Sequence, residues 1–196
     1  MKPFILLTFD VEEFDLPLEF GCHISEDDQI RFSASGLQKL EAVLSKHNIP
    51  ATLFTTLYYA EKNQETITRL AEKHEIASHS KYHTPFSETD PLESREGLEK
   101  ITGRKIAGFR MPHYRKIDLA LLKNAGYSYD SSLNPTIVPG RYNNLSAPRT
   151  IYRDLASGLT EVPVSVSPLL RFPLFWLSFK NLPFKFYLDM CRRTLQ

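Results

Sequence analysis

Residues 75–83 have the sequence EIASHSKYH, in which a short strand-like run ends directly in a pair of histidines. His79 and His83 are four residues apart, a spacing that places both rings on one face of a helical turn and lets them reach the same point. Two such rings supply the neutral nitrogen ligands that a borderline metal such as zinc accepts. Pairs at this spacing are also common in cores and on surfaces without metal, so the meaning of this one depends on the residues that the fold brings beside it.

Composition limits the class of protein. The chain has 196 residues, 42% of them hydrophobic, which predicts one α/β domain with a sizeable core. The formal net charge of +1 gives no indication of a nucleic-acid partner. Two cysteines, Cys22 and Cys191, do not make a disulfide framework, and the first residues lack the pattern of a secretory signal. We therefore expect a cytoplasmic protein with free thiols and no transmembrane segment.

Strand-like and helix-like patterns alternate along the chain. A largely apolar run at 4–9 predicts a buried strand, whereas 14–32 has no clear period and predicts a loop. Ser35 and Gln38 form a capping-box pattern that predicts the start of a helix, which residues 48–50 end. The remaining predicted elements are strands at 51–55, 75–78, 105–109, 127–129 and 159–166, helices at 57–73, 92–102 and 117–124, and a long loop at 134–150. This alternation is typical of parallel βα units.

Polar residues stand at the carboxyl ends of several predicted strands. They are Asp10, Glu12, Glu13, His79, Arg110 and Asp130. Because the carboxyl ends of parallel strands meet at one edge of the sheet, we expect these side chains to lie close together. Acidic residues after a strand are often turn formers or helix caps. Three carboxylates within four positions, however, repel one another unless a cation is present, which favours a metal site.

Residues 169–190 form an unusual apolar and aromatic stretch, LLRFPLFWLSFKNLPFKFYLDM. Prolines and basic residues interrupt it too often for it to span a bilayer. One interpretation is a membrane-surface anchor or a partner surface. The other is an apolar helix and loop packed on the rest of the fold, with the lysine stems covering apolar surface. No period separates a polar face, which favours the packed interpretation.

Three short motifs resemble, in order, the first three motifs of the polysaccharide deacetylase family, also called the NodB-homology family or carbohydrate esterase family 4. They are TFDVE at 8–12, HSKYH at 79–83 and FRMP at 109–112, and the similarity extends from residue 4 to residue 166. The resemblance implies a distorted, incomplete (β/α) barrel, often with seven strands, as a single deacetylase-like domain over 1–196. It also implies metal-dependent hydrolysis of an N-acetyl group, usually on an N-acetylated sugar or polysaccharide, which is then the expected partner.

The first motif departs from the family's usual pattern. The family commonly places two aspartates side by side, a general base followed by a metal ligand, whereas here Val11 follows Asp10. The resemblance therefore implies Asp10 as the base and Glu12, one position later, as the ligand. Alternation along an extended chain puts Asp10 and Glu12 on the same side. Glu13 is then expected to point away, toward solvent or a loop partner.

The second and third motifs match the family directly. His79 and His83 correspond to its metal-binding histidines, and Arg110 corresponds to the arginine that pairs with the catalytic aspartate and orients it. Zinc is the expected metal, and cobalt, nickel or iron also suit two imidazoles and one carboxylate. For Arg110 the alternative is a structural ion pair elsewhere.

Three further residues are expected on the substrate side. Asp130 falls in the region of the family's fourth motif, although the tryptophan often found there is absent. Tyr114 is expected to offer its backbone N–H to the oxyanion that forms from the amide. His113, in the same loop as Arg110, either lines the substrate pocket or protonates the leaving amine.

One catalytic group of the family has no counterpart. The family commonly protonates the leaving amine with a histidine after a late strand, but all six histidines of this chain lie at or before His113. We therefore expect the chain to be truncated at its C-terminus, with a further strand and the missing histidine beyond Gln196. The alternative is that His113 takes the role of the acid.

Two other functions fit the same residues. One is hydrolysis of another non-peptide C–N bond, in a cyclic imide or a ureide, and the other is metal-dependent glycan binding with weak catalysis. Release of acetate, measured with and without a chelator, separates the three. The sequence contains no GxSxG motif, no glycine-rich phosphate loop and no CxxC, which gives no support to a serine hydrolase, a nucleotide enzyme or a zinc finger.

Overall fold

The computed structural model describes residues 4–195 of the chain. Its centre is a seven-stranded sheet with the strand order β1-β2-β3-β4-β5-β9-β8. Neighbouring strands are parallel throughout, except that β8 and β9 are antiparallel. The strands are β1 (Thr8–Val11), β2 (Thr52–Thr55), β3 (Glu75–Ser78), β4 (Gly108–Phe109), β5 (Tyr129–Asp130), β8 (Tyr152–Arg153) and β9 (Thr160–Glu161).

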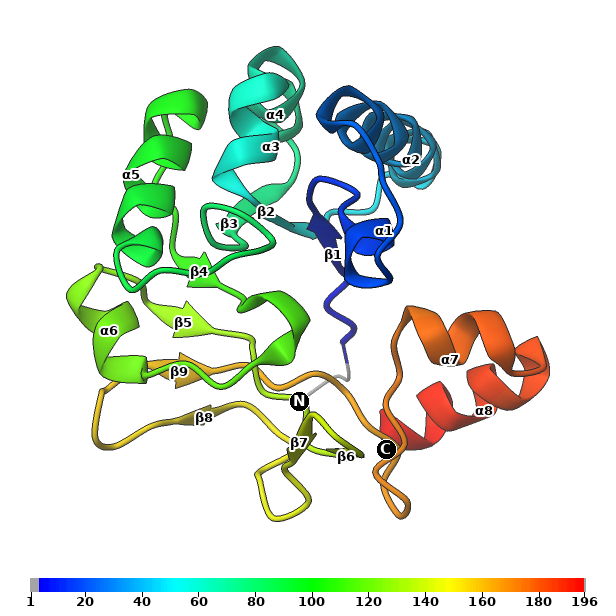
Figure 1. Cartoon of the computed structure of the whole chain (residues 1–196). Coiled ribbons are helices and arrows are strands. Elements are labelled where there is room, and N and C mark those ends of the chain that lie inside the picture. The colour runs from blue at the N-terminus through cyan, green and yellow to red at the C-terminus, as the bar shows by residue number, and fades with distance from the viewer. Residues whose placement is uncertain (1–3, 196) are drawn as a thin grey trace.

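Helices follow most of the parallel strands and cover the outside of the curved sheet (Figure 1). They are α1 (Leu16–Glu19), α2 (Glu26–His47), α3 (Leu57–Lys62), α4 (Gln64–Leu70), α5 (Asp90–Thr102) and α6 (Leu119–Asn124), with the 3-10 turn η1 (Pro112–Tyr114) after β4. No described strand joins β1 to β8, so the sheet curls without closing. This is the predicted α/β fold, an incomplete (β/α) barrel with seven strands.

The core lies between the short strands and the inner faces of the helices. Leu53, Ile76 and Phe109, on β2, β3 and β4, are buried in one cluster with side chains from the helices. Those helix side chains include Leu37, Leu57, Ile67, Leu98 and Leu122. Burial of an aliphatic or aromatic side chain of this size contributes about 1.5–3 kcal/mol. The cluster therefore holds the strands firmly, and with them the positions of their carboxyl ends.

The first strand begins later than predicted. β1 starts at Thr8, and residues 4–7 lie outside the sheet with exposed side chains. The N–H of Thr52 donates to the carbonyl of Leu7 at 3.0 Å, but Pro50 has no N–H with which to extend the ladder further back. The predicted run therefore loses its partner strand at Thr8.

The loop predicted over 14–32 contains α1 and the start of α2. α2 begins at Glu26, well before the predicted start at Ser35. The hydroxyl of Ser25 accepts the backbone N–H of Asp28 at 3.2 Å, and three acidic residues occupy the first turn. Negative charge stabilises a helix N-terminus. The acidic run is thus a helix start and not a polar loop.

Several other elements differ in length from their predictions. The fourth, fifth and sixth predicted strands reduce to two residues each in β4, β5 and β9, and the helix predicted over 57–73 breaks at Asn63 into α3 and α4. The predicted loop at 134–150 contains a small antiparallel hairpin of β6 (Ile137–Val138) and β7 (Tyr142–Asn143). Short pairings of this kind carry too few alternating positions to be recognised in the sequence.

The apolar stretch at 169–190 begins outside any helix and then contains α7 (Trp176–Asn181) and most of α8 (Phe184–Thr194). They lie beyond β1, on the opposite side of the sheet from α5 and α6 (Figure 1). Within these two helices only Ser178 and Met190 are buried. The aromatic side chains are therefore not packed on the sheet, contrary to the favoured interpretation. No helix among residues 4–195 is long and apolar enough to cross a bilayer.

Candidate metal centre and active site

The carboxyl ends of β1, β3 and β4 bring most of the predicted site residues to one edge of the sheet. Asp10 lies in β1 and Glu12 directly follows it, while His79 follows β3 and Arg110 follows β4. Adjacent strands are ~5 Å apart. Residues that are distant in the sequence therefore become neighbours at this edge, as expected.

Three ligand atoms converge there. Oε2 of Glu12 lies 3.0 Å from Nε2 of His79 and 3.4 Å from Nε2 of His83. All three residues can place a ligand atom within 4.8 Å of the others. Both histidines are buried, whereas the side chain of Glu12 is 30% exposed, so the group remains accessible from the side of Glu12.

The second nitrogen of each ring is held by another acceptor. Nδ1 of His79 lies 2.8 Å from the carbonyl oxygen of Arg110, and Nδ1 of His83 lies 2.7 Å from Oδ1 of Asp15. Because a carbonyl and a carboxylate can only accept, each Nδ1 carries a hydrogen and donates it. In the neutral ring, Nε2 is then a free lone pair directed at Glu12. Metal-binding histidines are commonly oriented in this way.

A cation fits this group of atoms. Oε2 of Glu12 is buried and receives no hydrogen bond from any described residue. With both rings neutral, three acceptor atoms face one another with no proton between them, which is unfavourable. Two imidazole nitrogens and one carboxylate oxygen are ligands that a catalytic zinc ion takes, and such a set leaves a coordination position open.

Electrostatics at His83 also favour positive charge. Burial disfavours protonation of the ring, but the hydrogen bond to Asp15 and the charges of Glu12, Asp15 and Glu13 outweigh it and raise the pKa of His83 above its ordinary value. The carboxylates that have this effect on a proton would act in the same direction on a metal ion.

The two histidines do not lie on a helical turn, contrary to the prediction. Residues 79–83 form a loop, in which Ser80 has a left-handed backbone with φ of 71°. The N-terminus of α3 fixes this loop, because the N–H groups of Leu57 and Tyr58 donate to the carbonyls of Ser80 and Lys81 at 3.1 and 2.9 Å. The rings converge through these tertiary contacts rather than through helical periodicity.

Glu13 is buried, so of its two expected surroundings, solvent or a loop partner, the structure confirms the loop partner. Its two carboxylate oxygens accept the backbone N–H of His83 at 2.8 Å and the hydroxyl of Thr56 at 2.7 Å. The hydroxyl of Thr56 also caps α3. Glu13 therefore ties the end of β1 to the loop that carries His83.

Asp10 and Arg110 form the predicted pair. Nη1 of Arg110 donates to Oδ1 of Asp10 at 2.8 Å, and the side chain of Asp10 is 30% exposed. Burial alone would raise the pKa of Asp10. The guanidinium of Arg110, with smaller contributions from the two histidines, outweighs burial and lowers this pKa below its usual range. Asp10 is therefore an accessible, ionised carboxylate beside the converging ligand atoms.

Arg110 is held in one orientation. Nη2 donates to the hydroxyls of Thr8 and Ser131, both at 3.0 Å, and Nε donates to the carbonyl of Ser131 at 3.2 Å. The guanidinium also lies over the ring of Phe54, 3.9 Å from its centroid. A planar donor fixed at several points presents Nη1 to Asp10 in a defined direction.

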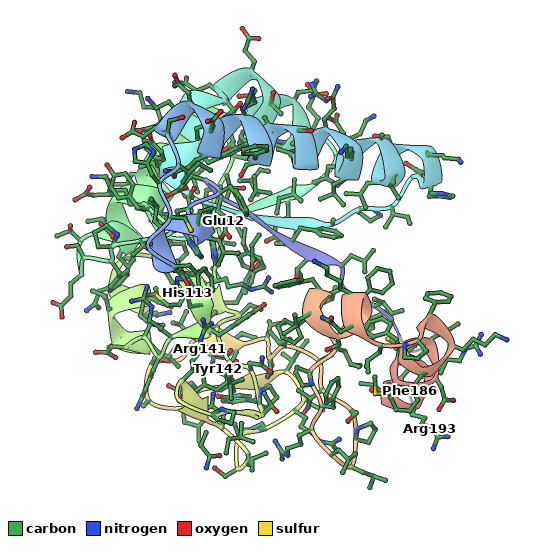
Figure 2. All side chains as sticks on the ribbon, turned by 45° about the vertical axis from the view of Figure 1, so that its right-hand side comes forward. Glu12, His113, Arg141, Tyr142, Phe186 and Arg193 are labelled. Carbon is green, nitrogen blue, oxygen red and sulfur yellow. The ribbon has the colours of Figure 1, made fainter. Side chains whose placement is uncertain are left out.

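His113 stands beside the ligand group. Its ring contacts the ring of His83, with centroids 4.3 Å apart, and its Nε2 lies 3.1 Å from Oε1 of Glu19. Figure 2 shows Glu12, His113 and Arg141 on the same side of the molecule. The positive charge of Arg141 contributes to lowering the pKa of His113. Burial and His83 are the larger causes of this lowering.

The backbone N–H of Tyr114 is engaged within its own turn. It donates to the carbonyl of Met111 at 3.1 Å, so it is not free for the oxyanion contact expected of it. Burial raises the pKa of the Tyr114 hydroxyl, which keeps the phenol neutral. The side chain remains partly exposed beside Asp10 and Arg110.

Asp130 lies below the surface of the site. Its carboxylate accepts the hydroxyl and the N–H of Ser132 at 2.6 and 3.2 Å, and it neighbours the carboxyl of Glu161. Only 2% of the residue is exposed. The expectation that Asp130 contacts substrate directly is therefore corrected.

Sequence reasoning missed several residues that organise the site. They are Asp15, Thr8 and Ser131, together with the role of Glu13. Asp15 stands close to the acidic run after β1, so proximity in sequence offered a weak signal for it. Thr8 begins the TFDVE motif, which gave it no role. Ser131 and Glu13 act through contacts with segments that are distant in sequence, and no local pattern identifies those contacts.

Known families and structures resemble this chain. A family model described as polysaccharide deacetylase matches residues 2–129. No curated protein shows a significant match to the chain.

Three solved structures share the fold. A Mycobacterium smegmatis protein described as a polysaccharide deacetylase has a TM-score of 0.61 at 25% identity, over 84% of this chain and 63% of that protein. A Pseudomonas aeruginosa PAO1 protein with the same description has a TM-score of 0.67 at 16% identity, over 95% and 69% of the two chains. Puue allantoinase has a TM-score of 0.63 at 15% identity, over 97% and 71%. The last two similarities show the fold alone. The chain spans less than two thirds of the length of the M. smegmatis protein.

Proposed function

The chain belongs to the polysaccharide deacetylase family, and we propose that it is a metal-dependent hydrolase that removes the N-acetyl group from an N-acetylated sugar or polysaccharide. The observation that carries the proposal is the convergence of Glu12, His79 and His83 beside an ionised Asp10. An amide is a poor electrophile, and water is a poor nucleophile near neutral pH. The reaction therefore needs a Lewis acid and a base within reach of one another.

Glu12, His79 and His83 are the residues that would hold the metal, with zinc as the candidate ion. When bound, a divalent ion of this kind supplies a Lewis acid that lowers the pKa of water and polarises a carbonyl. Asp15 and the carbonyl of Arg110 would keep the two rings in the tautomer that binds metal.

Asp10 is the candidate general base. Its low pKa keeps the carboxylate free of a proton at neutral pH, and its side chain is 30% exposed, so water can reach it. Arg110 holds one carboxylate oxygen through Nη1, which leaves the other to accept a proton from water. Fixing a base in this way avoids reorganisation when the proton moves.

His113 is the candidate on this chain for protonation of the leaving amine. The amine departs readily only with a proton. The ring of His113 contacts the ring of His83, and its Nε2 lies 3.1 Å from Oε1 of Glu19. Replacement of His113 by alanine tests this role, because it should lower kcat while leaving metal content unchanged.

Two alternatives share the same residues. Hydrolysis of a ureide or cyclic imide needs the same metal and base, and Puue allantoinase has the same fold. A glycan-binding protein would keep the ligand residues and bind N-acetylated sugar without turnover. Neither is favoured by a contact of this chain, so both serve as outcomes of the assay.

The test is release of acetate from N-acetylated chito-oligosaccharides by the zinc-loaded chain. We expect turnover that a chelator abolishes and added zinc restores, and that Asp10→Asn loses. Asp27→Asn, an exposed aspartate in the first turn of α2, is the matched control and should behave like the parent. Turnover of allantoin or a cyclic imide in place of the sugar would overturn the proposed substrate. Sugar binding without any acetate release would overturn the proposed catalysis.

A further inference from the structure

Two buried carboxyl groups lie side by side on adjacent strands of the sheet. Asp130 on β5 and Glu161 on β9 are register partners on adjacent parallel strands. Their side chains therefore point to the same face of the sheet. They are 2% and 3% exposed, and each is a hydrogen-bonding neighbour of the other.

Hydrogen bonds distinguish the two carboxyls. Asp130 accepts the hydroxyl and the N–H of Ser132, at 2.6 and 3.2 Å. Glu161 accepts the N–H of Leu133 at 3.1 Å through Oε1. Asp130 therefore receives two hydrogen bonds that stabilise its ionised form, whereas Glu161 receives one. The second oxygen of Glu161 is left for the contact with Asp130.

Among residues 4–195, no cation pairs with either carboxyl. The titratable groups that face it from the neighbouring segments are Tyr152 on β8 and Asp154 in the turn that follows. The guanidinium of Arg110, at the end of β4, is directed to Ser131 and Asp10 instead. Two carboxylates in direct contact, both out of water, cannot both stay ionised at neutral pH.

We propose that Asp130 and Glu161 share one proton, carried by Glu161, and together act as a positioning pair that fixes Arg110 and through it the catalytic aspartate. The proton lies in a hydrogen bond from Glu161 to Asp130. The positioning role rests on the proposed function, whereas the shared proton does not. Burial and the neighbouring Asp130 raise the pKa of Glu161 to about 9, which agrees with a protonated side chain at neutral pH.

The pair acts through two serines that follow β5. Ser132 joins Asp130 to the backbone, because its hydroxyl also accepts the N–H of Met111 at 2.8 Å. Ser131 accepts Nη2 of Arg110 and donates to the carbonyl of Val162, the residue after Glu161, at 2.8 Å. Arg110 and Met111 are thus held by the segment that the carboxyl pair anchors.

The shared proton is tested by the pH dependence of stability. A glutamate that keeps its proton in the fold up to about pH 9, but loses it near its ordinary 4.5 when unfolded, makes stability fall as pH rises between these values. Glu161→Gln mimics the protonated acid, donates to Asp130 and cannot ionise. The melting temperature of the variant should therefore rise relative to the parent as pH goes from 5 to 9.

The matched control is Glu99→Gln on α5, the same chemical change at a part-buried carboxylate that also accepts a backbone N–H, from Ile106 at 3.2 Å. This control should not reproduce the progressive gain with pH. If the difference in melting temperature between Glu161→Gln and the parent is the same at every pH, Glu161 does not hold a proton and the proposal fails.

Positioning is tested by comparing Glu161→Ala with Glu161→Gln. Glu161→Ala should lower kcat by up to roughly 100-fold with little change in KM, because the base is displaced and the substrate surface is not. Glu161→Gln should recover most of that loss, and metal content should stay the same in both. A rise in KM with unchanged kcat, or no recovery by glutamine, would overturn the positioning role.

Hydrogen exchange separates this proposal from the proposed function. The amides of Met111 and Leu133 should lose protection in Glu161→Ala and keep it in Glu161→Gln, whether or not the chain turns over sugar. If these amides stay protected in Glu161→Ala, the pair does not hold the segment. Absence of acetate release in the parent would count against the deacetylase alone.

Discussion

At the carboxyl ends of β3 and β4, the polar side chains of His79 and Arg110 are buried, whereas in α7 and α8 aromatic side chains are exposed. His79 and Arg110 are 2% and 4% exposed, while Trp176 and Phe186 are 64% and 55% exposed. Figure 2 shows Glu12 and His113 well separated from Phe186 and Arg193. A prediction from hydropathy alone would expose His79 and Arg110 and bury Trp176 and Phe186. Polar side chains can be buried at the site because groups on neighbouring strands and loops form hydrogen bonds with them. The exposed aromatic side chains of the two helices are not covered by any described element.

The two regions therefore differ in what a substitution removes. At the site a side chain has several polar partners, and truncation leaves those partners buried and unsatisfied. In the helices a truncated aromatic ring was largely in water already, so little is lost. Four experiments test this contrast, the largest expected effect first.

Removal of a metal ligand should have the largest effect. His79→Ala takes away a buried nitrogen ligand, so we expect loss of stoichiometric zinc and of all measurable turnover. Phe186→Ala, in α8, should keep both. Elemental analysis of the purified proteins after dialysis measures the metal content. Unchanged zinc in both His79→Ala and His83→Ala would show that these histidines are not the ligands.

Substitution of the base, Asp10, should have the second-largest effect. Its effect on kcat should be distinguishable from the effect on zinc binding of substituting the ligand, Glu12. Asp10→Asn should keep the zinc and lower kcat by about 10²–10⁴-fold, the usual contribution of a general base. Glu12→Gln should instead weaken zinc binding. Titration with a zinc-buffered indicator, run beside the acetate assay, distinguishes the two variants. Equal loss of zinc from both would mean that the roles of Asp10 and Glu12 are not those proposed.

Asp15 should affect the metal only indirectly. Asp15→Asn keeps the shape of the side chain but weakens the acceptor at Nδ1 of His83, so the zinc affinity should fall by about 10–100-fold. Asp28→Asn near the start of α2 changes an aspartate that is outside the site and should leave the affinity unaltered. The same zinc titration measures both. An unchanged affinity in Asp15→Asn would remove Asp15 from the site.

A matched pair of phenylalanines should give the smallest effect. Phe186→Ala should change the free energy of unfolding by no more than about 0.5 kcal/mol. The same substitution at Phe109, which is fully buried on β4, should cost about 3–5 kcal/mol. Urea unfolding followed by circular dichroism compares them. A cost for Phe186 close to that for Phe109 would mean that α8 packs on a surface in solution.

Much of the fold was predictable because it rests on local patterns. The strand at 75–78, the helix at 92–102 and the end of α2 at Asn48 all appear close to where expected. Apolar runs, caps and glycine positions act over a few residues. Where the patterns failed, as at the start of α2, a serine and an acidic run were interpreted as a loop instead of a cap.

The site was predictable in its residues but not in its geometry. Strand ends placed Asp10, His79 and Arg110 at one edge, which the structure confirms, whereas the roles that the motifs imply for them are proposals. The loop conformation of 79–83 could not be predicted, because the N-terminus of α3 and the carboxylate of Glu13 determine it. The partnership of Asp130 with Glu161 was equally hidden, because it depends on which strand lies beside β5.

β1 has a further consequence, for behaviour at high concentration. Among the described strands it pairs with β2 alone, and exposed apolar residues 4–7 lead into it. Unpaired backbone groups along such an edge offer a template to the same segment of another molecule. Self-association should therefore increase light scattering as the protein is concentrated. Leu6→Lys, which adds charge to this edge, should suppress it without touching a metal ligand or the base.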